Sequence, residues 1–332
     1  MPENKAIFVA GGAGFIGSAL VRALVERSPD ARVVVFDNFA HGRRENLDGV
    51  ACTIVEGDVL DAHALDDAFA AHRPDVVFDL VSETYVPTAY ALPRRFLRTN
   101  VEGTLNLLQA SKSFDVRKMI YASTTEVYGE ASGALDEKQP FSPLNTYAVT
   151  KAAADRLCAT FVEEHRVPVV IARLFNGYGP RATHPYVIPE IITQLSKGSR
   201  VVLGNVEARR DFTYVDDVAR ALIAIADADV APGEVFNVGS DQCVGVRELV
   251  SIVGELFERK DVRIDVDSSR FRRHDIDSFR CDARKLQRAT GWKPTVELRA
   301  GLRRTIEWFR AHGGQWSWEL DYEKRIRIAD AR

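Results

Sequence analysis

Residues 7–17 read Ile-Phe-Val-Ala-Gly-Gly-Ala-Gly-Phe-Ile-Gly, a short apolar run that ends in closely spaced glycines. The run is typical of a buried strand, and apolar residues at helical spacing over 18–27 predict that a helix follows. In such a unit Gly11 allows the tight turn, Gly14 lets a phosphate approach the backbone, and Gly17 permits close packing of the helix on the strand. The start of the helix offers free N–H groups and a positive dipole end to a pyrophosphate.

An acidic residue follows at the spacing that a dinucleotide-binding unit requires, about 20 residues beyond the glycines. It is Asp37, at the end of a second apolar run over residues 32–36. An aspartate at this point can accept both hydrogen bonds from an adenosine ribose, and its charge repels a 2′-phosphate. The sequence therefore predicts NAD as the cofactor in preference to NADP. Arg43 and Arg44 leave one alternative open, a 2′-phosphate held by a folded-back loop.

Strand-like apolar runs alternate with helical patterns through the first half of the chain. Further strands are expected over residues 53–56, 75–80, 118–122 and 167–173, and helices over 65–71, 100–113 and 147–164. This alternation predicts an α/β protein with a Rossmann-type doubly wound parallel sheet. From about residue 175 glycines and prolines cluster, which indicates a smaller C-terminal substrate-binding lobe. We expect a cofactor domain over 1–175 and the second lobe over 176–332, with part of 211–240 returning to the first domain.

Composition limits the classes of protein to consider. Of 332 residues, 46% are hydrophobic and 27% are charged, which are ordinary values for a folded chain. The net charge of −3 gives no reason to expect nucleic acid or a membrane as a partner. The cysteines lack metal-ligand spacing and are expected to be reduced, so no metal is expected. Since no signal peptide or run of about 20 apolar residues is recognised, we expect a cytoplasmic protein.

Tyr147 and Lys151 stand four residues apart in a predicted helix, so they share one face. An ammonium near a phenol favours the tyrosinate and lowers the pKa of the tyrosine. Tyr147 is therefore a candidate general base for a hydroxyl proton during hydride transfer. Taken alone, the pair is equally compatible with an amphipathic surface helix.

Further motifs follow in order along the chain: Asp37-Asn-Phe39, Asn100-Val-Glu-Gly-Thr104, Ser123 with Tyr147 and Lys151, Arg173-Leu-Phe-Asn-Gly-Tyr-Gly-Pro180, and Arg210-Asp-Phe-Thr-Tyr-Val-Asp-Asp217. With the glycine motif, they resemble the extended short-chain dehydrogenase/reductase family, and within it the NAD-dependent sugar-nucleotide epimerases and dehydratases. The similarity runs to about Trp308. It implies a nucleotide-sugar substrate held mainly by residues 176–332, and a homodimer packed through helices near 101–112 and 148–164.

The resemblance also implies roles for the matching residues. Those expected to bind the cofactor are Gly11, Gly14, Phe15, Ile16, Gly17, Asp37, Asn38, Asp58, Val59, Leu80, Ser82, Asn100, Ser123, Tyr147 and Lys151. Those expected to bind the substrate are Glu83, Asn176, Val187, Arg210 and Arg272. A guanidinium fork suits the diphosphate, which agrees with the two arginines. Asp79 departs from the family, whose members often carry histidine there.

The segment 121–129, Tyr-Ala-Ser-Thr-Thr-Glu-Val-Tyr-Gly, separates activities within this family. Plain 4-epimerases usually carry a small residue where this chain has Glu126, whereas dehydratases place a glutamate there. The resemblance implies oxidation of the sugar at C4, removal of the C5 proton by Glu126, loss of water from C6 and hydride return to C6. The expected catalytic residues are Thr124, Thr125, Glu126, Tyr147 and Lys151. Thr124 is expected to form a hydrogen bond with the C4 oxygen of the sugar.

No subgroup matches throughout. Residues 82–86 are similar to dTDP-glucose 4,6-dehydratases, but Thr125 stands where those enzymes have an acidic Asp that protonates the departing hydroxyl. A closer similarity to GDP-mannose 4,6-dehydratases is found in residues 123–126, 203–211 and 270–273. Those enzymes generally use NADP, whereas Asp37 favours NAD, so this chain departs from them at that position. The general acid is left open between Glu126 and a water molecule. A 4,6-dehydratase is the preferred hypothesis; a UDP-glucuronate decarboxylase, a 4-epimerase and a non-catalytic NAD-binding sensor or scaffold are the alternatives.

Overall fold

A parallel seven-stranded sheet forms the centre of the larger domain. The computed structural model describes residues 5–130, 133–271, 274–316 and 318. The strand order is β3-β2-β1-β4-β5-β7-β11, and every neighbouring pair is parallel. The strands are β1 Ala6–Ala10, β2 Arg32–Asp37, β3 Thr53–Glu56, β4 Val76–Asp79, β5 Lys118–Thr124, β7 Val169–Leu174 and β11 Val235–Val238. The expected Rossmann-type fold is confirmed.

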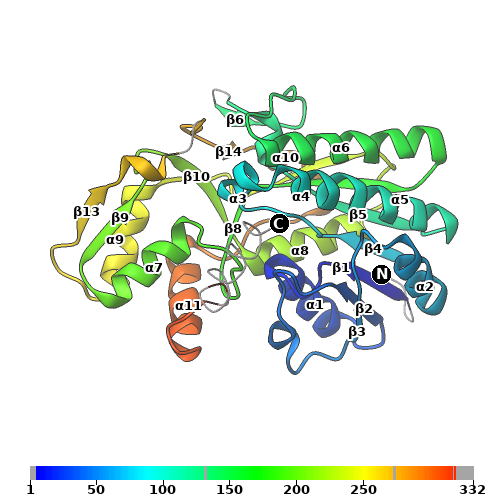
Figure 1. Ribbon diagram of the computed structural model, residues 1–332, viewed down its shortest axis with the longest axis horizontal. Helices are drawn as coiled ribbons and strands as arrows, with labels where there is room; N and C mark the ends of the chain where they lie inside the picture. Colours follow the sequence, from blue (N-terminus) through cyan, green and yellow to red (C-terminus); the bar gives the residue numbers. More distant parts are fainter. Residues whose placement is uncertain (1–4, 131–132, 272–273, 317, 319–332) are drawn as a thin grey trace.

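Helices cover both faces of the sheet (Figure 1). One face packs against α1 (Phe15–Arg27) and α8 (Val215–Asp227), and the other against α2 (Ala62–His72), α5 (Gly103–Ser113) and α6 (Thr146–His165). Within β1, Ile7 and Val9 belong to the first apolar cluster and Phe8 and Ala10 to the second. Because both faces are buried, the central strands are apolar at successive positions. The edge strand β3, which was expected to be buried, is largely exposed.

The connection between β4 and α5 is more helical than the sequence indicates. It contains α3 (Val86–Ala91), α4 (Pro93–Leu97) and a π-helical turn, η2 (Arg98–Glu102), so the helix expected over 100–113 begins differently. Pro87 and Pro93 suggest breaks in structure, yet each occupies one of the first two positions of its helix. Proline is tolerated there because those N–H groups have no partner within the helix.

The smaller lobe has its own apolar core, built largely from residues after 177. β12-β10-β8 form a three-stranded sheet, β13-β9 and β14-β6 form two-stranded ones. This lobe is built from β8 Asn176–Tyr178, α7 Val187–Lys197, β9 Arg200–Leu203, β10 Arg209–Tyr214, β12 Cys243–Gly245, α9 Val246–Leu256, β13 Arg263–Val266 and α11 Leu298–Ala311, with a 3₁₀ turn at η4 Ser268–Arg270. The remaining elements pack with the larger domain: β6 Ala134–Leu135, β14 Arg280–Cys281, α10 Arg284–Thr290, and the 3₁₀ turns η1 Arg44–Leu47 and η3 Thr125–Tyr128.

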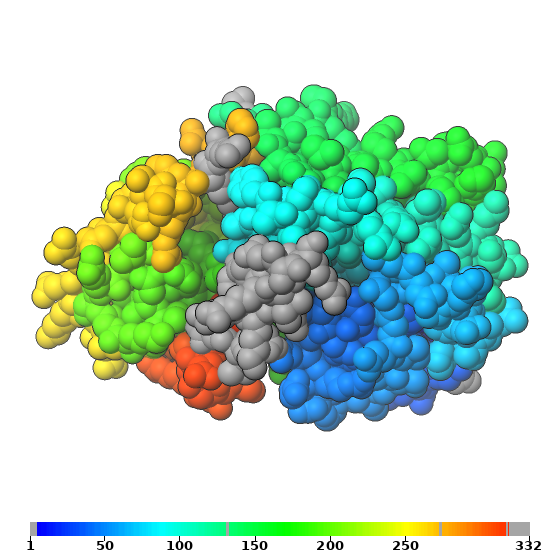
Figure 2. Space-filling view, viewed as in Figure 1, coloured from blue at the N-terminus to red at the C-terminus, as the bar shows by residue number. Residues whose placement is uncertain are grey.

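The chain after α11 is anchored in this core by Trp316. Its side chain is fully buried, it packs on Phe309, and its indole N–H donates to Thr193 Oγ1 at 2.8 Å. Trp318 stacks on Trp316 with ring centroids 5.3 Å apart. Figure 2 shows the smaller lobe, in light green, yellow and red, beside the larger domain in blue, cyan and green. None of the helices in the described part of the chain is both long and apolar enough to cross a bilayer.

Candidate active site

A cavity of about 1230 Å³ lies at the carboxyl ends of the parallel strands, between the two lobes. Gly11, Asp37, Leu80 and Thr124 contribute to it from the ends of β1, β2, β4 and β5. The smaller lobe contributes residues of β8, β10 and the start of α7. Ligands of open α/β sheets bind at this edge, and the volume exceeds the roughly 300–1,000 Å³ typical of small-molecule sites.

The turn between β1 and α1 requires its glycines. Gly11 has a φ of +77°, and a Cβ there would lie 2.9 Å from the backbone of Leu80. A Cβ on Gly17 would lie 2.1 Å from the carbonyl oxygen of Gly11. Gly14 is the N-cap of α1 and no side chain caps the helix, so its first N–H groups are available to an anion. These features fit a pyrophosphate.

Asp37 lies beside this turn. Its carboxylate accepts hydrogen bonds from the backbone N–H of Ala13 at 2.9 Å and of Phe39 at 2.8 Å. Burial raises the pKa of Asp37, and these two hydrogen bonds oppose that change. Each carboxylate oxygen has a further lone pair, so the position suits the two hydroxyls of an adenosine ribose.

Most other residues expected at the cofactor line the same cavity: Phe15, Ile16, Asn38, Asp58, Val59, Leu80, Ser82 and Ser123. Asn38 also donates to Asp58 Oδ2 at 3.0 Å, which joins the loops that follow β2 and β3. Asn100 differs from the expectation, because it is fully buried and does not line the cavity. Its amide is occupied by Ser82, Glu83 and Thr150, so it holds the loop after β4 against α6.

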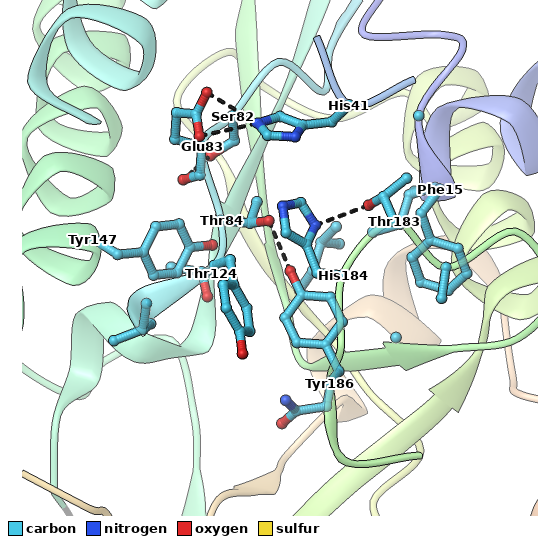
Figure 3. Close-up of a pocket in the computed structure, with 18 of the residues that line it drawn as sticks. Phe15, His41, Ser82, Glu83, Thr84, Thr124, Tyr147, Thr183, His184 and Tyr186 are labelled. Atoms are coloured by element: carbon cyan, nitrogen blue, oxygen red, sulfur yellow. Dashed lines mark hydrogen bonds and ion pairs between the residues drawn. The ribbon is translucent and has the colours of Figure 1, made fainter. Parts of the chain in front are cut away.

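The expected catalytic residues meet in the cavity. Thr124 ends β5, Thr125 and Glu126 begin η3, and Tyr147 and Lys151 lie on α6. The side chain of Thr124 hydrogen-bonds to Tyr147, and Figure 3 shows the two residues together. The carboxylate of Glu126 accepts a 2.7 Å hydrogen bond from the amide of Asn145, the N-cap of α6.

Lys151 does not act on Tyr147 as the sequence suggested. Its Nζ donates to the carbonyl oxygen of Ala122 at 2.7 Å and lies 4.3 Å from the centre of the Tyr121 ring. Burial raises the pKa of Tyr147, Thr124 lowers it, and Glu126 is among the groups that raise it further. The expected lowering by Lys151 is therefore wrong for this arrangement. Burial also lowers the pKa of Lys151 to about 8, against the opposing effect of Asp79.

A buried ion pair, which no motif in the sequence indicates, supports the floor of the site. Arg173 binds both carboxylate oxygens of Asp155 at 3.0 Å, and Asp155 also accepts from Ser123 Oγ at 2.8 Å. Arg173 further donates to the hydroxyl of Tyr128 at 3.1 Å. Thus Ser123 lines the cavity and its hydroxyl points into this network.

The residues expected at the substrate fall into two groups. Asn176, Val187 and Arg210 line the part of the cavity formed by the smaller lobe. Val187 is the first residue of α7, whose N-terminus has no side-chain cap. Arg272 lies outside the described residues. Arg270, which was not proposed as a site residue, lines the cavity and pairs with Glu190 at 3.0 Å.

Glu83 also lines the cavity, but its carboxylate is already paired. Arg95 Nε lies 2.7 Å and His41 Nε2 3.0 Å from its oxygens. Burial favours the neutral acid, yet His41 and Arg95 together lower the pKa of Glu83. The carboxylate therefore joins the loop after β2 to α4.

Contacts that no pattern in the sequence indicates cross from the larger domain to the loop before α7. Tyr186 and Thr84 have their hydroxyl oxygens 2.7 Å apart, and the His184 ring lies 4.8 Å from that of His41 (Figure 3). A cluster of glycine and proline marks this loop as irregular and does not say where its side chains point. Among the residues that the structure describes, no group of His, Cys, Asp or Glu is arranged to hold a metal ion.

The model of the GDP-mannose 4,6 dehydratase family matches residues 8–305. This chain belongs to that family. The dTDP-D-glucose 4,6-dehydratase of Mus musculus is 32% identical over 323 residues, which cover 94% of this chain and 90% of the mouse protein. The expected assignment to the sugar-nucleotide epimerases and dehydratases is thereby confirmed.

Solved structures of the family include both activities. The dTDP-glucose 4,6-dehydratase of Streptomyces venezuelae, solved with NAD bound, is 32% identical with a TM-score of 0.86, over 94% of this chain and 99% of that one. The UDP-glucose 4-epimerase of Thermotoga maritima, solved with UDP-glucose, is also 32% identical, with a TM-score of 0.85, over 92% of this chain and 99% of that one. Overall similarity therefore does not distinguish a dehydratase from an epimerase. The distinction has to come from the residues of the site.

Proposed function

We propose that this family member is an NAD-dependent nucleotide-sugar 4,6-dehydratase. One observation carries the assignment: the carboxylate of Glu126 stands in the cavity close enough to Tyr147 to affect its pKa, and Asn145 holds it there. A 4-epimerase has no use for a carboxylate at this point, because it breaks no C5–H bond. A dehydratase needs a base for the C5 proton beside the group that serves C4.

The glycine turn, the uncapped start of α1 and the carboxylate of Asp37 would hold the NAD pyrophosphate and adenosine ribose. When bound, NAD supplies the two-electron oxidation at C4 and the later reduction at C6. Lys151 would hold the nicotinamide ribose from the floor of the cavity. The start of α7 and Arg210 would receive the diphosphate of the nucleotide sugar, because an uncapped helix N-terminus and a guanidinium both favour phosphate.

The side chains of this chain move two protons in the proposed reaction. Tyr147 takes the proton of the C4 hydroxyl as C4 is oxidised, while Thr124 hydrogen-bonds to the same centre and favours the tyrosinate. The C5 proton is then acidic because it lies α to a ketone. Glu126 removes it, and a hydroxyl leaves C6 as water. Glu126 afterwards returns a proton to C5.

Turnover in D₂O separates this proposal from the 4-epimerase alternative. A dehydratase exchanges the C5 proton through Glu126, so NMR of the product is expected to show deuterium at C5 of a 4-keto-6-deoxy sugar. An epimerase leaves every carbon-bound hydrogen in place, and a product without carbon-bound deuterium would reject the dehydratase. Release of CO₂ from a hexuronate would instead favour the decarboxylase.

We also propose that the protein works as a homodimer in the cytoplasm. Leu97 on α4 and Val149 on α6 are 55% and 51% exposed, which supports an apolar contact through these helices. The four cysteines are free thiols, as in a reducing compartment. Sedimentation of the purified chain tests the dimer: Leu97→Glu is expected to give monomers, and an unchanged sedimentation coefficient would place the contact elsewhere.

A further inference from the structure

Loss of water from C6 requires a proton for the departing hydroxyl, and the residue at position 125 is a poor source. Thr125 is 3% exposed, and its hydroxyl oxygen is buried with no hydrogen-bond partner among the described residues. An aliphatic hydroxyl is also a much weaker acid than a carboxyl or a phenol. Another acidic group must therefore face the sugar, if Glu126 is engaged with the C5 proton.

Tyr186 brings a second phenol to the catalytic centre from the smaller lobe. It is the N-cap residue of α7 and lines the cavity. Its hydroxyl oxygen lies 2.7 Å from Thr84 Oγ1, although 102 residues separate the two in sequence. Figure 3 shows the Tyr186 ring reaching toward Thr84, on the side of the cavity that faces Tyr147 and Thr124.

The Tyr186 phenol is close enough to Tyr147 to affect its pKa. After burial, the charges of Glu126 and Tyr186 are the influences that raise the pKa of Tyr147. Tyr147, Glu126 and Tyr186 line the same cavity from three elements: α6, the turn η3 and the loop before α7. A hexose oxidised at C4 by Tyr147 has C5 and C6 on the adjoining positions of the same ring.

The position of the ring is fixed by packing. Tyr186 lies 5.6 Å from the ring of His184 and 6.0 Å, edge-on, from that of Tyr85. Its backbone N–H donates to the carbonyl of His184 at 2.8 Å, and its own carbonyl accepts from Glu190 at 3.0 Å. A phenylalanine at this position keeps these contacts and loses the hydroxyl alone.

We propose that Tyr186 is the general acid of the dehydration, a step that rests on the proposed 4,6-dehydratase function. The C6–O bond breaks as Glu126 takes the C5 proton, and the electron pair of the C5–H bond becomes the C5–C6 π bond. The phenol of Tyr186 gives its proton to the departing hydroxyl, which leaves as water. Thr84 donates a hydrogen bond to the resulting phenolate, which regains a proton from solvent.

The test compares leaving groups that differ in their need for a proton. Probes are dTDP-, UDP- and GDP-linked glucose and mannose, each with its 6-deoxy-6-fluoro analogue, because fluoride leaves without protonation. For Tyr186→Phe we expect water elimination to slow about 100-fold or more, the usual contribution of general acid catalysis. Release of fluoride should stay within a few-fold of the unaltered protein. Reduction of bound NAD in a single turnover should also be preserved.

Tyr90→Phe is the matched control, since Tyr90 also lines the cavity but is 50% exposed and has no part in the proposed reaction. It should leave both eliminations unchanged. Equal loss of water and fluoride elimination in Tyr186→Phe would overturn the assignment and make Tyr186 a positioning residue. If Tyr186→Phe keeps both water and fluoride elimination, the proton for the departing hydroxyl comes from Glu126 or water, and the assignment is overturned as well. If the unaltered protein eliminates neither water nor fluoride from any probe, the dehydratase function itself fails, which is a distinguishable result.

Discussion

The side-chain amide of Asn145 donates a 2.7 Å hydrogen bond to Glu126 Oε2, while its carbonyl oxygen accepts from the backbone N–H of Ala148 at 2.9 Å. One residue thus caps α6 and orients the proposed base. Because α6 carries Tyr147, the cap also ties the position of Glu126 to that of the phenol. Substitutions of Asn145 can therefore distinguish its effect on helix stability from its effect on the position of Glu126.

We predict that Asn145→Asp slows turnover roughly 100-fold, the order expected when a catalytic group is misplaced. Aspartate caps a helix as well as asparagine, so thermal stability should change little, but a second carboxylate repels Glu126. Asn145→Ala should lose turnover and also about 1 kcal/mol of stability with the cap. Steady-state kinetics and thermal unfolding of both variants provide the check; full activity of Asn145→Asp would show that this contact does not orient the base.

Lys151 sets an alkaline limit on activity in this account. Burial lowers its pKa to about 8, Asp79 is the largest opposing influence, and Cys158 and Asp155 add to it. The ammonium also lies over the Tyr121 ring. If it is needed for cofactor binding, activity falls as pH rises through about 8. The unfolded chain holds this proton up to its ordinary pKa of 10.5, so the contribution of Lys151 to stability increases with pH between these values.

Asp79→Asn should move the alkaline limb of the kcat/KM profile to lower pH. The asparagine can still accept from Thr104, whose hydroxyl lies 3.0 Å from Asp79 Oδ2, so the fold should persist. Asp75→Asn, beside the opposite end of β4, is the control and should leave the limb in place. An identical pH profile for Asp79→Asn would mean that this carboxylate does not support the charge of Lys151.

The Arg173–Asp155 pair is predicted to be costly to break singly. Both side chains are nearly fully buried, so Asp155→Asn leaves an uncompensated guanidinium, and the free energy of unfolding should fall by about 3–5 kcal/mol. The double variant Asp155→Asn, Arg173→Met removes the stranded charge and should regain part of this loss. Urea unfolding of the three proteins measures the difference. A loss below about 1 kcal/mol in Asp155→Asn would show that solvent or a neighbour compensates Arg173.

Asp37→Asn should weaken NAD binding about 10- to 100-fold, since hydrogen bonds to a charged acceptor are worth about 1.5–3 kcal/mol. Loss of the negative charge should affect NADP less, so the preference for NAD over NADP narrows. Titration calorimetry with both dinucleotides measures it. Glu56→Gln, at the end of the neighbouring strand and paired with Arg44, is the control. An unchanged preference in Asp37→Asn would place the ribose away from this carboxylate.

The sequence predicts the cofactor half of the molecule well because its signals are local. The Gly11 turn, the acid at Asp37 and the parallel strands depend on neighbours in sequence and take the expected form, except that the edge strand β3 is largely exposed instead of buried. Side-chain partners from distant segments carry no such signal. Asn100 matches the family motif but is occupied by Ser82, Glu83 and Thr150, and only the folded arrangement reveals this.

The structure of the smaller lobe is the part that the sequence predicts least well, because the lobe combines short strands with long loops. Tyr186 lies in a stretch after Pro180 without hydrophobic periodicity, and its partner Thr84 comes from the other domain. Trp316 stands among glycines and polar residues that give no sign of a core position, yet it fills the core of the lobe. Contacts of this kind depend on how the two lobes pack, which no local pattern encodes.

The most direct test is mass spectrometry of the purified protein incubated with UDP-, GDP-, dTDP- and CDP-linked hexoses, hexosamines and hexuronates. The proposed dehydratase predicts that one nucleotide sugar loses the mass of one water, and that Glu126→Gln abolishes this change. Loss of the mass of CO₂, or unchanged mass with every sugar together with epimerisation detected by NMR, would contradict it.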